Sequence, residues 1–195
     1  GDDHSRWGRF TSIERYVTQY GLAVVMPNAL VSRYTNMAYG WRFRDYIAEE
    51  LPQIMSSMFY FSEKREDTYI AGLSMGGTGA LTIGLSQPDR FAAIGVLSAG
   101  NWVAEKMYTP DIMPVETIKK RVRTNLICYG VEDTSALLGN PTYDAFEMAR
   151  QAMKQGGPLP RIFHAIGTED HKYQNAQITR KFFQELEGNP FGYSY

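Results

Sequence analysis

A serine framed by glycines is the clearest chemical signal in the chain. Residues 72–76 read Gly-Leu-Ser-Met-Gly; they follow the apolar run 69–71 and precede a stretch, 77–86, whose composition predicts a helix. Gly-x-Ser-x-Gly between a strand and a helix is the pattern of a nucleophile elbow, a sharp turn that exposes the serine hydroxyl. Neighbouring side chains would collide with the strand and the helix, which explains the glycines. We predict that Ser74 is a nucleophile; the alternative is a glycine-rich turn that only packs a helix on a sheet.

An acid is the second residue that this chemistry requires. A serine hydroxyl becomes a strong nucleophile when a histidine takes its proton and an acid orients that histidine. With an elbow of this kind the chain order is serine, acid, histidine, and Asp133, Glu169 and Asp170 follow apolar stretches at suitable places. We favour Asp170, because it follows the cleaner strand pattern and precedes the last strong helix. Asp133 remains the second choice, Glu169 would serve if the loop were shifted by one residue, and each of the three could instead be a solvated loop acid.

The histidine that would act as the base is harder to find. The chain has three histidines, His4, His164 and His171. His164 falls inside a predicted strand and is expected in the core or in a wall of the site. His171 directly follows Asp170, and adjacent side chains tend to diverge. His4 is out of order along the chain, so none of the three fits well.

The two ends of the chain bear on the same question. Residues 191–195 look like the start of a further strand, and the base is expected after that strand, beyond Tyr195. Residues 1–7 read like the far side of a loop that donates a second oxyanion-hole amide, which would then lie before Gly1. Losing the histidine leaves only about 10³–10⁴ of rate enhancement over water. This chain is therefore expected to be nearly inactive if no base is supplied.

The elements that must position these residues alternate along the chain. Apolar runs predict strands at 22–26, 67–73, 91–97 and 161–166, and periodic patterns predict helices at 11–20, 44–59, 77–86 and 173–187. Continuous apolar strands alternating with helices are typical of a parallel sheet that is covered on both faces. The active site of such a sheet lies at the carboxyl ends of its strands. Ser74, Ser98 and residues 167–170 all fall at such ends.

The stretch 99–160 is less regular and is punctuated by proline and glycine. A segment inserted after a strand end usually forms a cap or one wall of the substrate pocket, and we expect that of residues 99–160. Trp102 is the substrate-binding candidate within it. Ordinary packing is the alternative for this side chain.

The composition narrows the class of protein. A chain of 195 residues with 44% hydrophobic and 21% charged residues suits one globular domain with a sizeable core. A net charge of −1 gives no reason to expect nucleic acid or an anionic membrane as a partner, and no apolar run nears the ~18 residues of a membrane span. The single cysteine, Cys128, excludes an internal disulfide, and the histidines lack metal-ligand spacing. We therefore expect no metal and no cofactor, and a cytoplasmic protein whose signal peptide, if any, would precede Gly1.

Six stretches carry a more specific combination: residues 1–3 with Trp7, then 20–27, 50–52, 70–77, 88–93 and 167–170. Together they resemble the esterase D group of α/β-hydrolases, and its tributyrin-esterase-like members in particular. That group includes short-chain carboxylesterases, S-formylglutathione hydrolases, feruloyl and acetylxylan esterases, and mycolyl transferases. The resemblance implies a three-layer α/β sandwich with a mostly parallel sheet, in one domain over 1–195 that is incomplete at both ends and lacks its first strands and its last strand. The family's His-Gly strand end and its final Gly-x-His are absent here.

The resemblance also implies roles for individual residues. Ser74 would be the nucleophile, Asp170 the acid, and the backbone amide of Met75 an oxyanion-hole donor. The expected reaction is hydrolysis of short-chain or aryl carboxylic esters through an acyl-enzyme on Ser74, with a small-molecule ester as the partner. An acyltransferase or S-formylglutathione hydrolase of the same family is the alternative, as is a non-catalytic binding module on a decayed hydrolase fold. Whether the chain forms a homo-oligomer stays open.

Overall fold

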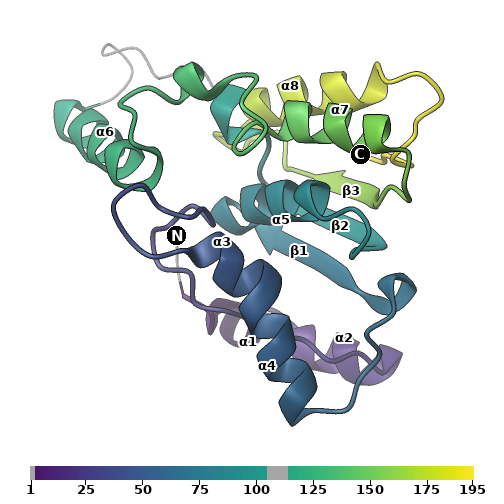
Figure 1. The fold of residues 1–195 in the computed structure, drawn as a ribbon. Helices are drawn as coiled ribbons and strands as arrows, with labels where there is room; N and C mark the ends of the chain where they lie inside the picture. Colours follow the sequence, from purple (N-terminus) through teal and green to yellow (C-terminus); the bar gives the residue numbers. More distant parts are fainter. Residues whose placement is uncertain (1–2, 105–113) are drawn as a thin grey trace.

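A parallel sheet lies at the centre of the molecule. The computed structural model describes residues 3–104 and 114–195 (Figure 1). Within these ranges β1 (Tyr69–Leu73), β2 (Ala93–Leu97) and β3 (Arg161–Ala165) form a three-stranded sheet in that order. All pairs are parallel. Three of the four predicted strands and the parallel sheet are therefore confirmed.

Helices connect and flank the strands. They are α1 (Arg6–Phe10), α2 (Ile13–Tyr20), α3 (Phe43–Asp45), α4 (Leu51–Met58), α5 (Met75–Ser86), α6 (Val115–Tyr129), α7 (Ala145–Gln155) and α8 (Tyr173–Gln184). Short 3-10 turns lie at η2 (Arg65–Asp67), η3 (Trp102–Ala104) and η4 (Thr134–Leu137). The predicted helices correspond to α2, to the run from α3 to α4, to α5 and to α8. No helix among the described residues combines the length and the apolar composition that crossing a bilayer would require.

The helix predicted across residues 44–59 contains a wide turn. A π-helical turn, η1 (Tyr46–Glu50), joins α3 to α4, and Pro52 stands in the first turn of α4. Proline has no N–H to donate to the carbonyl four residues earlier, and its ring crowds that carbonyl. The guanidinium of Arg90 donates to this oxygen, the carbonyl of Ala48. The helix thus widens into a π-turn before Pro52, and the carbonyl that the proline cannot pair is satisfied from another element.

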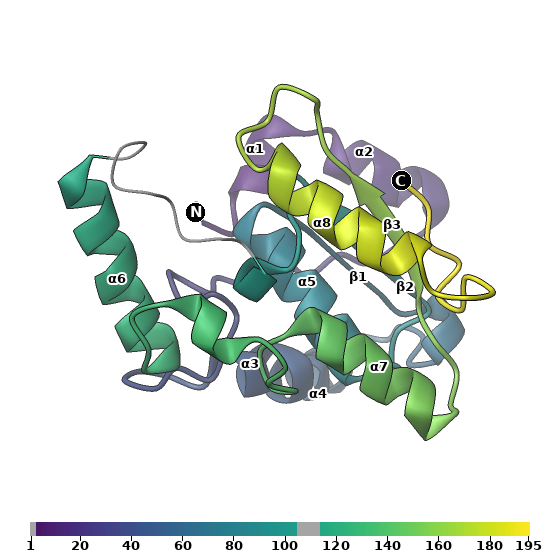
Figure 2. The same ribbon diagram turned by 90° about the horizontal axis from the view of Figure 1, so that it is seen from above.

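One face of the sheet is covered by helices and holds the core. Figure 1 and Figure 2 show α5, α7 and α8 on the same side of the strands, with α6 standing apart at one end. The core joins these three helices to the strands and to the C-terminal segment, through Ala80, Leu81 and Leu85, Ile94 and Val96, Ala145, Met148 and Ala149, Ile162, Phe183 and Phe191. Every strand residue in this core points to the helix side, as alternation along a strand requires.

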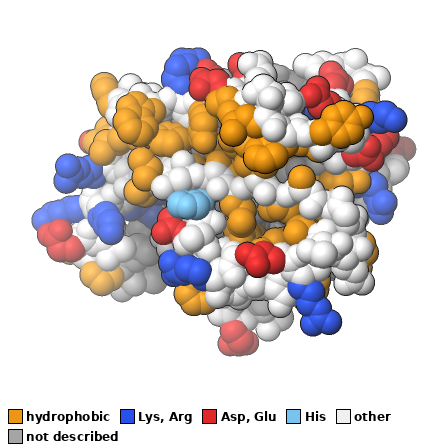
Figure 3. Space-filling model, turned by 90° about the horizontal axis from the view of Figure 1, so that it is seen from below, with side chains coloured by type: hydrophobic (Ala, Val, Ile, Leu, Met, Phe, Trp, Pro, Cys, Tyr) orange, Lys and Arg blue, Asp and Glu red, His pale blue; other side chains and the backbone are white. Residues whose placement is uncertain are grey.

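The opposite face of the sheet differs from the prediction. Tyr69, Leu73 and Phe163 point to it and are 54%, 44% and 55% exposed. Helices α1 and α2 lie on this side (Figure 1), and hydrophobic side chains gather across the underside of the molecule (Figure 3). Helices therefore lie on both sides of the sheet, as expected, but within the described residues those on this side leave the outward-facing strand residues about half exposed.

The strand predicted at 22–26 is also absent. Residues 22–29 have no regular secondary structure, and Leu22, Val24 and Val25 are each more than two-fifths exposed. An apolar run becomes a strand only where another strand satisfies its backbone groups. None of the described strands pairs with this segment, so the local pattern is not realised here.

The C-terminal segment, in contrast, pairs with the sheet as expected. Ser194 forms a parallel bridge with Phe163. The amide of His164 donates to the carbonyl of Ser194 at 2.9 Å, and the amide of Ser194 donates to the carbonyl of Ile162 at 2.9 Å. The prediction that residues 191–195 begin a further strand is confirmed in its pairing, which places these residues beside β3.

Candidate active site

Ser74 occupies a strained turn between β1 and α5. Its backbone dihedral angles are φ 56° and ψ −117°, a conformation that non-glycine residues rarely adopt. The amide of Ser74 donates to the carbonyl of Leu97 at 2.8 Å, which ties the turn to the end of β2. The side chain is partly exposed. Among the described contacts its hydroxyl has no hydrogen-bond partner, so the geometry is that of a raised, accessible nucleophile.

Glycines are required around this turn for steric reasons. A Cβ atom on Gly72 would lie 2.1 Å from the carbonyl oxygen of Gly76. A Cβ atom on Gly77 would lie 2.7 Å from the Cβ atom of Ala99. Both distances are far below van der Waals contact, so the strand and the helix approach each other as closely as their backbones permit. The steric argument made from the sequence is therefore confirmed for Gly72 and Gly77, whereas a Cβ atom on Gly76 would make only ordinary contacts.

Tyr34 packs against α5 and explains why position 79 is a glycine. The sequence analysis did not identify this tyrosine as part of the site. A Cβ atom on Gly79 would lie 2.5 Å from Cγ of Tyr34, and one on Gly76 would lie 3.5 Å from the Tyr34 hydroxyl. The tyrosine ring thus packs flat against the first turns of α5, and burial raises the pKa of its hydroxyl. Glycines three residues apart after the elbow serine were the available signal, because they mark a helix face that something approaches closely.

Ser98 repeats the geometry of Ser74 at the next strand end. Its φ is 48°, and its amide donates to the carbonyl of Ala165, the last residue of β3, at 2.8 Å. The amide of Ser74 makes the equivalent bond to β2. The carboxyl ends of all three strands therefore meet at one edge of the sheet, as the sequence analysis expected.

Met75 is the first residue of α5. The first amides of a helix have no acceptor within the helix, and the helix dipole adds positive potential there. The amide of Met75 follows the serine directly, which is the position of an oxyanion-hole donor behind a nucleophile elbow. Its role remains a prediction that this location supports.

The segment after β2 is held by side chains at three consecutive carbonyls. Nε2 of His164 donates to the carbonyl of Ala99 at 2.8 Å, Oγ1 of Thr78 to that of Gly100 at 3.1 Å, and Nδ2 of Asn175 to that of Asn101 at 2.9 Å. The donors come from β3, α5 and α8. They fix the chain between Ser98 and η3, and so fix where Trp102 stands.

Asp144 is the most connected acid around this segment. It is buried, and its carboxylate accepts from Nδ2 of Asn101 at 2.7 Å, from the amide of Gly139 at 2.7 Å and from the amide of Phe146 at 2.9 Å. The last bond caps α7. The sequence analysis did not consider Asp144, although an Asp with Glu147 three residues later is a helix N-terminus signal. The carboxylate holds structure here and is not near a histidine among the described contacts.

His164 is a core residue, as expected. It is fully buried, with Nε2 2.8 Å from the carbonyl of Ala99 and Nδ1 2.7 Å from the hydroxyl of Tyr193. A carbonyl only accepts, so Nε2 carries the proton and Nδ1 accepts from Tyr193 in the neutral ring. Burial lowers the pKa of His164, against the opposing effect of the bond to Ala99. Both ring nitrogens are engaged, so His164 does not serve as the base for Ser74.

Asp170 and His171 lie in contact, which the sequence analysis did not expect. Oδ1 of Asp170 is 3.4 Å from Nδ1 of His171 and also accepts from the amide of Lys172 at 2.8 Å. The side chain of Asp170 is 21% exposed and that of His171 is 78% exposed. The turn into α8 bends the chain so that the two neighbouring side chains meet rather than diverge. None of the described contacts joins His171 to Ser74.

The other acids of the sequence analysis have plainer surroundings. Asp133 caps η4, where its carboxylate accepts from the amide of Ser135 at 2.9 Å, and it is exposed. Glu169 is exposed as well. Neither contacts a histidine among the described residues. Of the three acids, only Asp170 has a histidine beside it.

Trp102 is the first residue of η3, directly after residues 99–101, whose carbonyls are held by side chains. It is partly buried. Three cationic side chains surround its ring: Cζ of Arg33 lies 3.6 Å from the ring centroid, Nζ of Lys172 4.3 Å and Cζ of Arg121 5.2 Å. They come from the loop before α3, the turn into α8 and helix α6. Ordinary core packing would surround an indole with apolar groups, so this environment is unusual.

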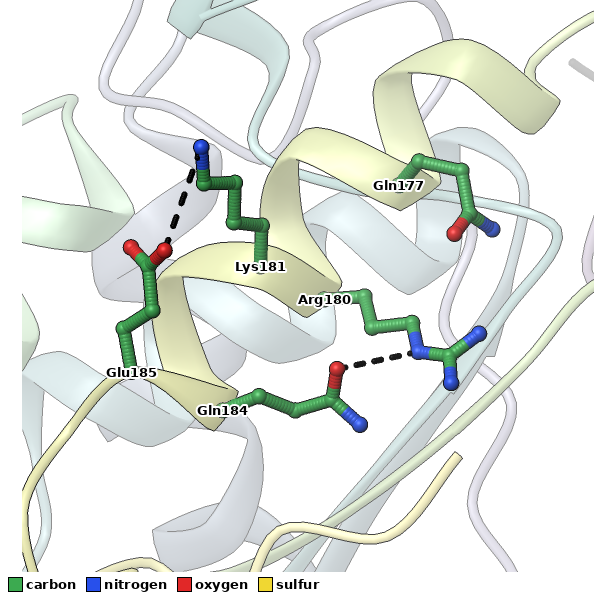
Figure 4. Close-up of a pocket in the computed structure, with 5 residues that line it drawn as sticks. All are labelled: Gln177, Arg180, Lys181, Gln184 and Glu185. Atoms are coloured by element: carbon green, nitrogen blue, oxygen red, sulfur yellow. Dashed lines mark hydrogen bonds and ion pairs between the residues drawn. The ribbon is translucent and has the colours of Figure 1, made fainter.

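A metal centre and a surface pocket are two other kinds of site that a protein can carry. Within residues 3–104 and 114–195, no group of three or more His, Cys, Asp or Glu is arranged to hold a metal ion. A surface depression of about 310 Å³ runs along α8 and is lined by Gln177, Arg180, Lys181, Gln184 and Glu185 (Figure 4). Its side chains bond to one another along the helix, as in the Arg180–Gln184 hydrogen bond. It contains none of the predicted site residues.

Known proteins resemble this chain along most of its length. The model of the Esterase family matches residues 5–190. An acetyl esterase of Caldicellulosiruptor saccharolyticus is 28% identical over 162 residues, which are 80% of this chain and 57% of that protein. The S-formylglutathione hydrolase FrmB of Staphylococcus aureus superposes with a TM-score of 0.77 at 31% identity, over 99% of this chain and 70% of that chain.

A transferase is among the relatives too. The diacylglycerol acyltransferase/mycolyltransferase Ag85B of Mycobacterium leprae is 32% identical over 108 residues, which are 50% of this chain and 32% of that protein. The chain thus spans little more than half of the acetyl esterase and about a third of the mycolyltransferase. The elbow, the parallel sheet and the match over residues 5–190 together show that this chain belongs to the Esterase family and has an α/β-hydrolase fold.

Proposed function

We propose that this chain carries the nucleophile and the acid of a serine carboxylesterase. The observation that supports this most is the conformation of Ser74, with φ at 56° on a turn where Gly72 and Gly77 leave no room for side chains. Strain of this kind costs about 1–3 kcal/mol and persists where function uses it. A binding module on a decayed fold would gain nothing from keeping it.

The proposed reaction uses these groups in turn. Ser74 Oγ attacks the ester carbonyl and forms a tetrahedral intermediate, whose oxyanion is held by the amide of Met75 and a second donor. The alcohol leaves, and water then releases the acid from the acyl-enzyme. Asp170 orients the histidine that takes the proton of Ser74.

The identity of that histidine is the open step of the proposal. His164 is fully engaged in the core, whereas His171 touches Asp170 at 3.4 Å. His171 is therefore the first residue of this chain to test. A histidine that lies beyond Tyr195 remains the expectation from the sequence.

The substrates that we propose are short-chain or aryl esters of carboxylic acids. The resemblance to an acetyl esterase and to S-formylglutathione hydrolase supports this class. Acyl transfer, as in the mycolyltransferase, would use the same residues and would differ only in keeping water from the acyl-enzyme. Product analysis with an added alcohol or sugar as acceptor separates the two.

The test is hydrolysis of p-nitrophenyl butyrate by this chain and by the product of its complete gene. Ser74→Ala should abolish the activity of whichever form is active. Ser98→Ala is the matched control, because Ser98 also has a positive φ at the next strand end; it should leave the rate within about twofold. If the 195-residue chain is active by itself, loss of that activity in His171→Gln would identify His171 as the base. Activity that survives Ser74→Ala would refute the proposal.

A further inference from the structure

The strained turn at Ser74 rests on the segment that ends and follows β2. The amide of Ser74 donates to the carbonyl of Leu97 at 2.8 Å. The methyl group of Ala99 packs on Gly77 so closely that a Cβ atom added to this glycine would lie 2.7 Å from it. Gly77 stands two residues after Met75, in the first turn of α5. A strained conformation persists only where its surroundings hold it, so the position of Ala99 bears directly on the elbow.

The position of Ala99 is in turn set by His164. The ring donates from Nε2 to the carbonyl of Ala99 at 2.8 Å and accepts at Nδ1 from the hydroxyl of Tyr193 at 2.7 Å. The rings of Tyr193 and Tyr195 pack edge-on against the imidazole, with centroids 6.0 and 5.2 Å away. The imidazole is fully buried and cannot turn without losing both hydrogen bonds. The carbonyl of Ala99 therefore has a donor with a fixed place and direction.

We propose that His164 is a positioning residue for the nucleophile elbow. Through Ala99 and Gly77 it sets where the amide of Met75 lies relative to Ser74, while it takes no proton itself. Burying an imidazole costs free energy that its hydrogen bonds only offset, so an apolar side chain would fill this core position at least as well. What the histidine adds is a directed donor. This role deepens the proposed function by adding a residue to its machinery, and it rests on that function.

Two polar variants of His164 separate the donor from the ring. In His164→Gln the side-chain amide nitrogen can reach the place of Nε2, whereas in His164→Asn it reaches only that of Nδ1, and the carbonyl of Ala99 loses its donor. In the p-nitrophenyl butyrate assay of the active form, His164→Asn should lower kcat and kcat/KM together by about 10- to 100-fold, with KM within about twofold. His164→Gln should stay within about threefold of the unmodified protein. Equal rates in the two variants would overturn the proposal.

Arg65→Met is the control for a general loss of stability. Arg65 donates to the carbonyls of Pro88 and Leu159 at 3.1 and 2.9 Å, which precede β2 and β3 at the opposite edge of the sheet. The variant removes side-chain donors to backbone carbonyls, as His164→Asn does, but far from the elbow. It should lower the free energy of unfolding and leave kcat unchanged. A fall in kcat equal to that of His164→Asn would reduce the role of His164 to stability alone.

Ala99→Gly tests the second link and does not depend on how the His164 variants fold. It removes the methyl group that packs on Gly77 and keeps the carbonyl that accepts from His164. We expect kcat to fall by about three- to tenfold. Combined with His164→Asn, the loss should be smaller than the product of the two single losses, because both changes act through the same contact. An unchanged rate in Ala99→Gly, or losses that multiply fully, would reject the path.

A measurement without activity separates this proposal from the proposed function. In NMR spectra of ¹⁵N-labelled protein, His164→Asn should shift the amide resonances of Met75 and Gly77, whereas His164→Gln and Arg65→Met should leave them in place. If the chain is no esterase, the unmodified protein shows no Ser74-dependent hydrolysis, and these resonances still decide whether His164 holds the turn. If only the positioning role is wrong, the unmodified protein hydrolyses the ester through Ser74, and His164→Asn does so equally fast with unshifted resonances.

Discussion

The elbow at the end of β1 (residues 72–76) and the loop at the end of β3 (residues 167–171, called the acid loop because it contains Asp170) are built in opposite ways. At the elbow, the amide of Ser74 is bonded to the neighbouring strand, and a side-chain atom on Gly72 would meet backbone at 2.1 Å. In the acid loop, a Cβ atom on Gly167 would meet nothing within 4 Å, and His171 is 78% exposed. The backbone of the elbow is confined by its neighbours, whereas the acid loop lies open to solvent.

This difference follows from what each group must do. A nucleophile in a strained conformation stays there only if its surroundings leave it no alternative. In the proposed mechanism the acid orients a histidine through a hydrogen bond, which needs correct orientation but little steric confinement. We therefore expect substitutions at the elbow to affect stability first, and substitutions in the acid loop to affect chemistry alone. Four predictions test this contrast, in order of decreasing effect on the free energy of unfolding.

Gly72→Ala should have the largest effect. The new methyl group would overlap the backbone of Gly76, which cannot move without displacing α5. We expect a loss of more than about 3 kcal/mol in the free energy of unfolding, measured by chemical denaturation. Gly167→Ala is the matched control in the acid loop and should change it by less than about 0.5 kcal/mol. Equal effects of the two variants would remove the contrast.

Asp144→Ala should come next. It removes a buried carboxylate that accepts three hydrogen bonds and leaves Nδ2 of Asn101 without its acceptor. The expected loss is about 2–4 kcal/mol in the free energy of unfolding. Asp133→Ala removes one exposed cap bond and should cost about 0.5–1 kcal/mol. A smaller loss for Asp144→Ala than for Asp133→Ala would mean that the hydrogen bond from Asn101 to Asp144 contributes little to the free energy of unfolding.

His164 should make the fold sensitive to mild acid. Its pKa is lowered in the folded chain by burial, so the unfolded chain binds the proton first as the pH falls. The free energy of unfolding should therefore decrease below pH ~6.5, by at most about 1.4 kcal/mol per pH unit. Denaturation between pH 5.5 and 7.5 measures this slope. His164→Gln should reduce it, whereas His4→Gln, at an exposed position, should leave it as it was.

Asp170→Asn should have the smallest effect on stability and a large one on catalysis. The carboxylate makes one bond to the amide of Lys172 and one contact with His171 at the surface. We expect less than about 0.5 kcal/mol in unfolding free energy. In the p-nitrophenyl butyrate assay, however, the rate of the active form should fall by about 10²–10⁴. Asp133→Asn is the control with an unchanged rate; a loss of rate there and none at Asp170 would exchange the two assignments.

Much of the fold was accessible from local pattern. The elbow, the three strands and the helices α2, α5 and α8 depend on residues near one another in sequence, where apolar periodicity and glycine spacing are reliable guides. The segment 22–26 shows the limit of this reasoning. Its apolar residues match those of a strand, yet no described strand pairs with it, and pairing is not a property of the segment itself.

The sequence by itself determined where the proposed nucleophile, Ser74, stands, because a serine between glycines can form this turn through backbone sterics alone. Only the tertiary structure decided which groups surround it. The cations around Trp102 come from positions 33, 121 and 172, and Asp144 holds Asn101 across 43 residues. Only one face of the sheet is covered by α5, α7 and α8. These contacts join side chains far apart in the sequence, which no periodic pattern relates. Their energies depend on which polar and charged groups are buried next to one another when the chain folds.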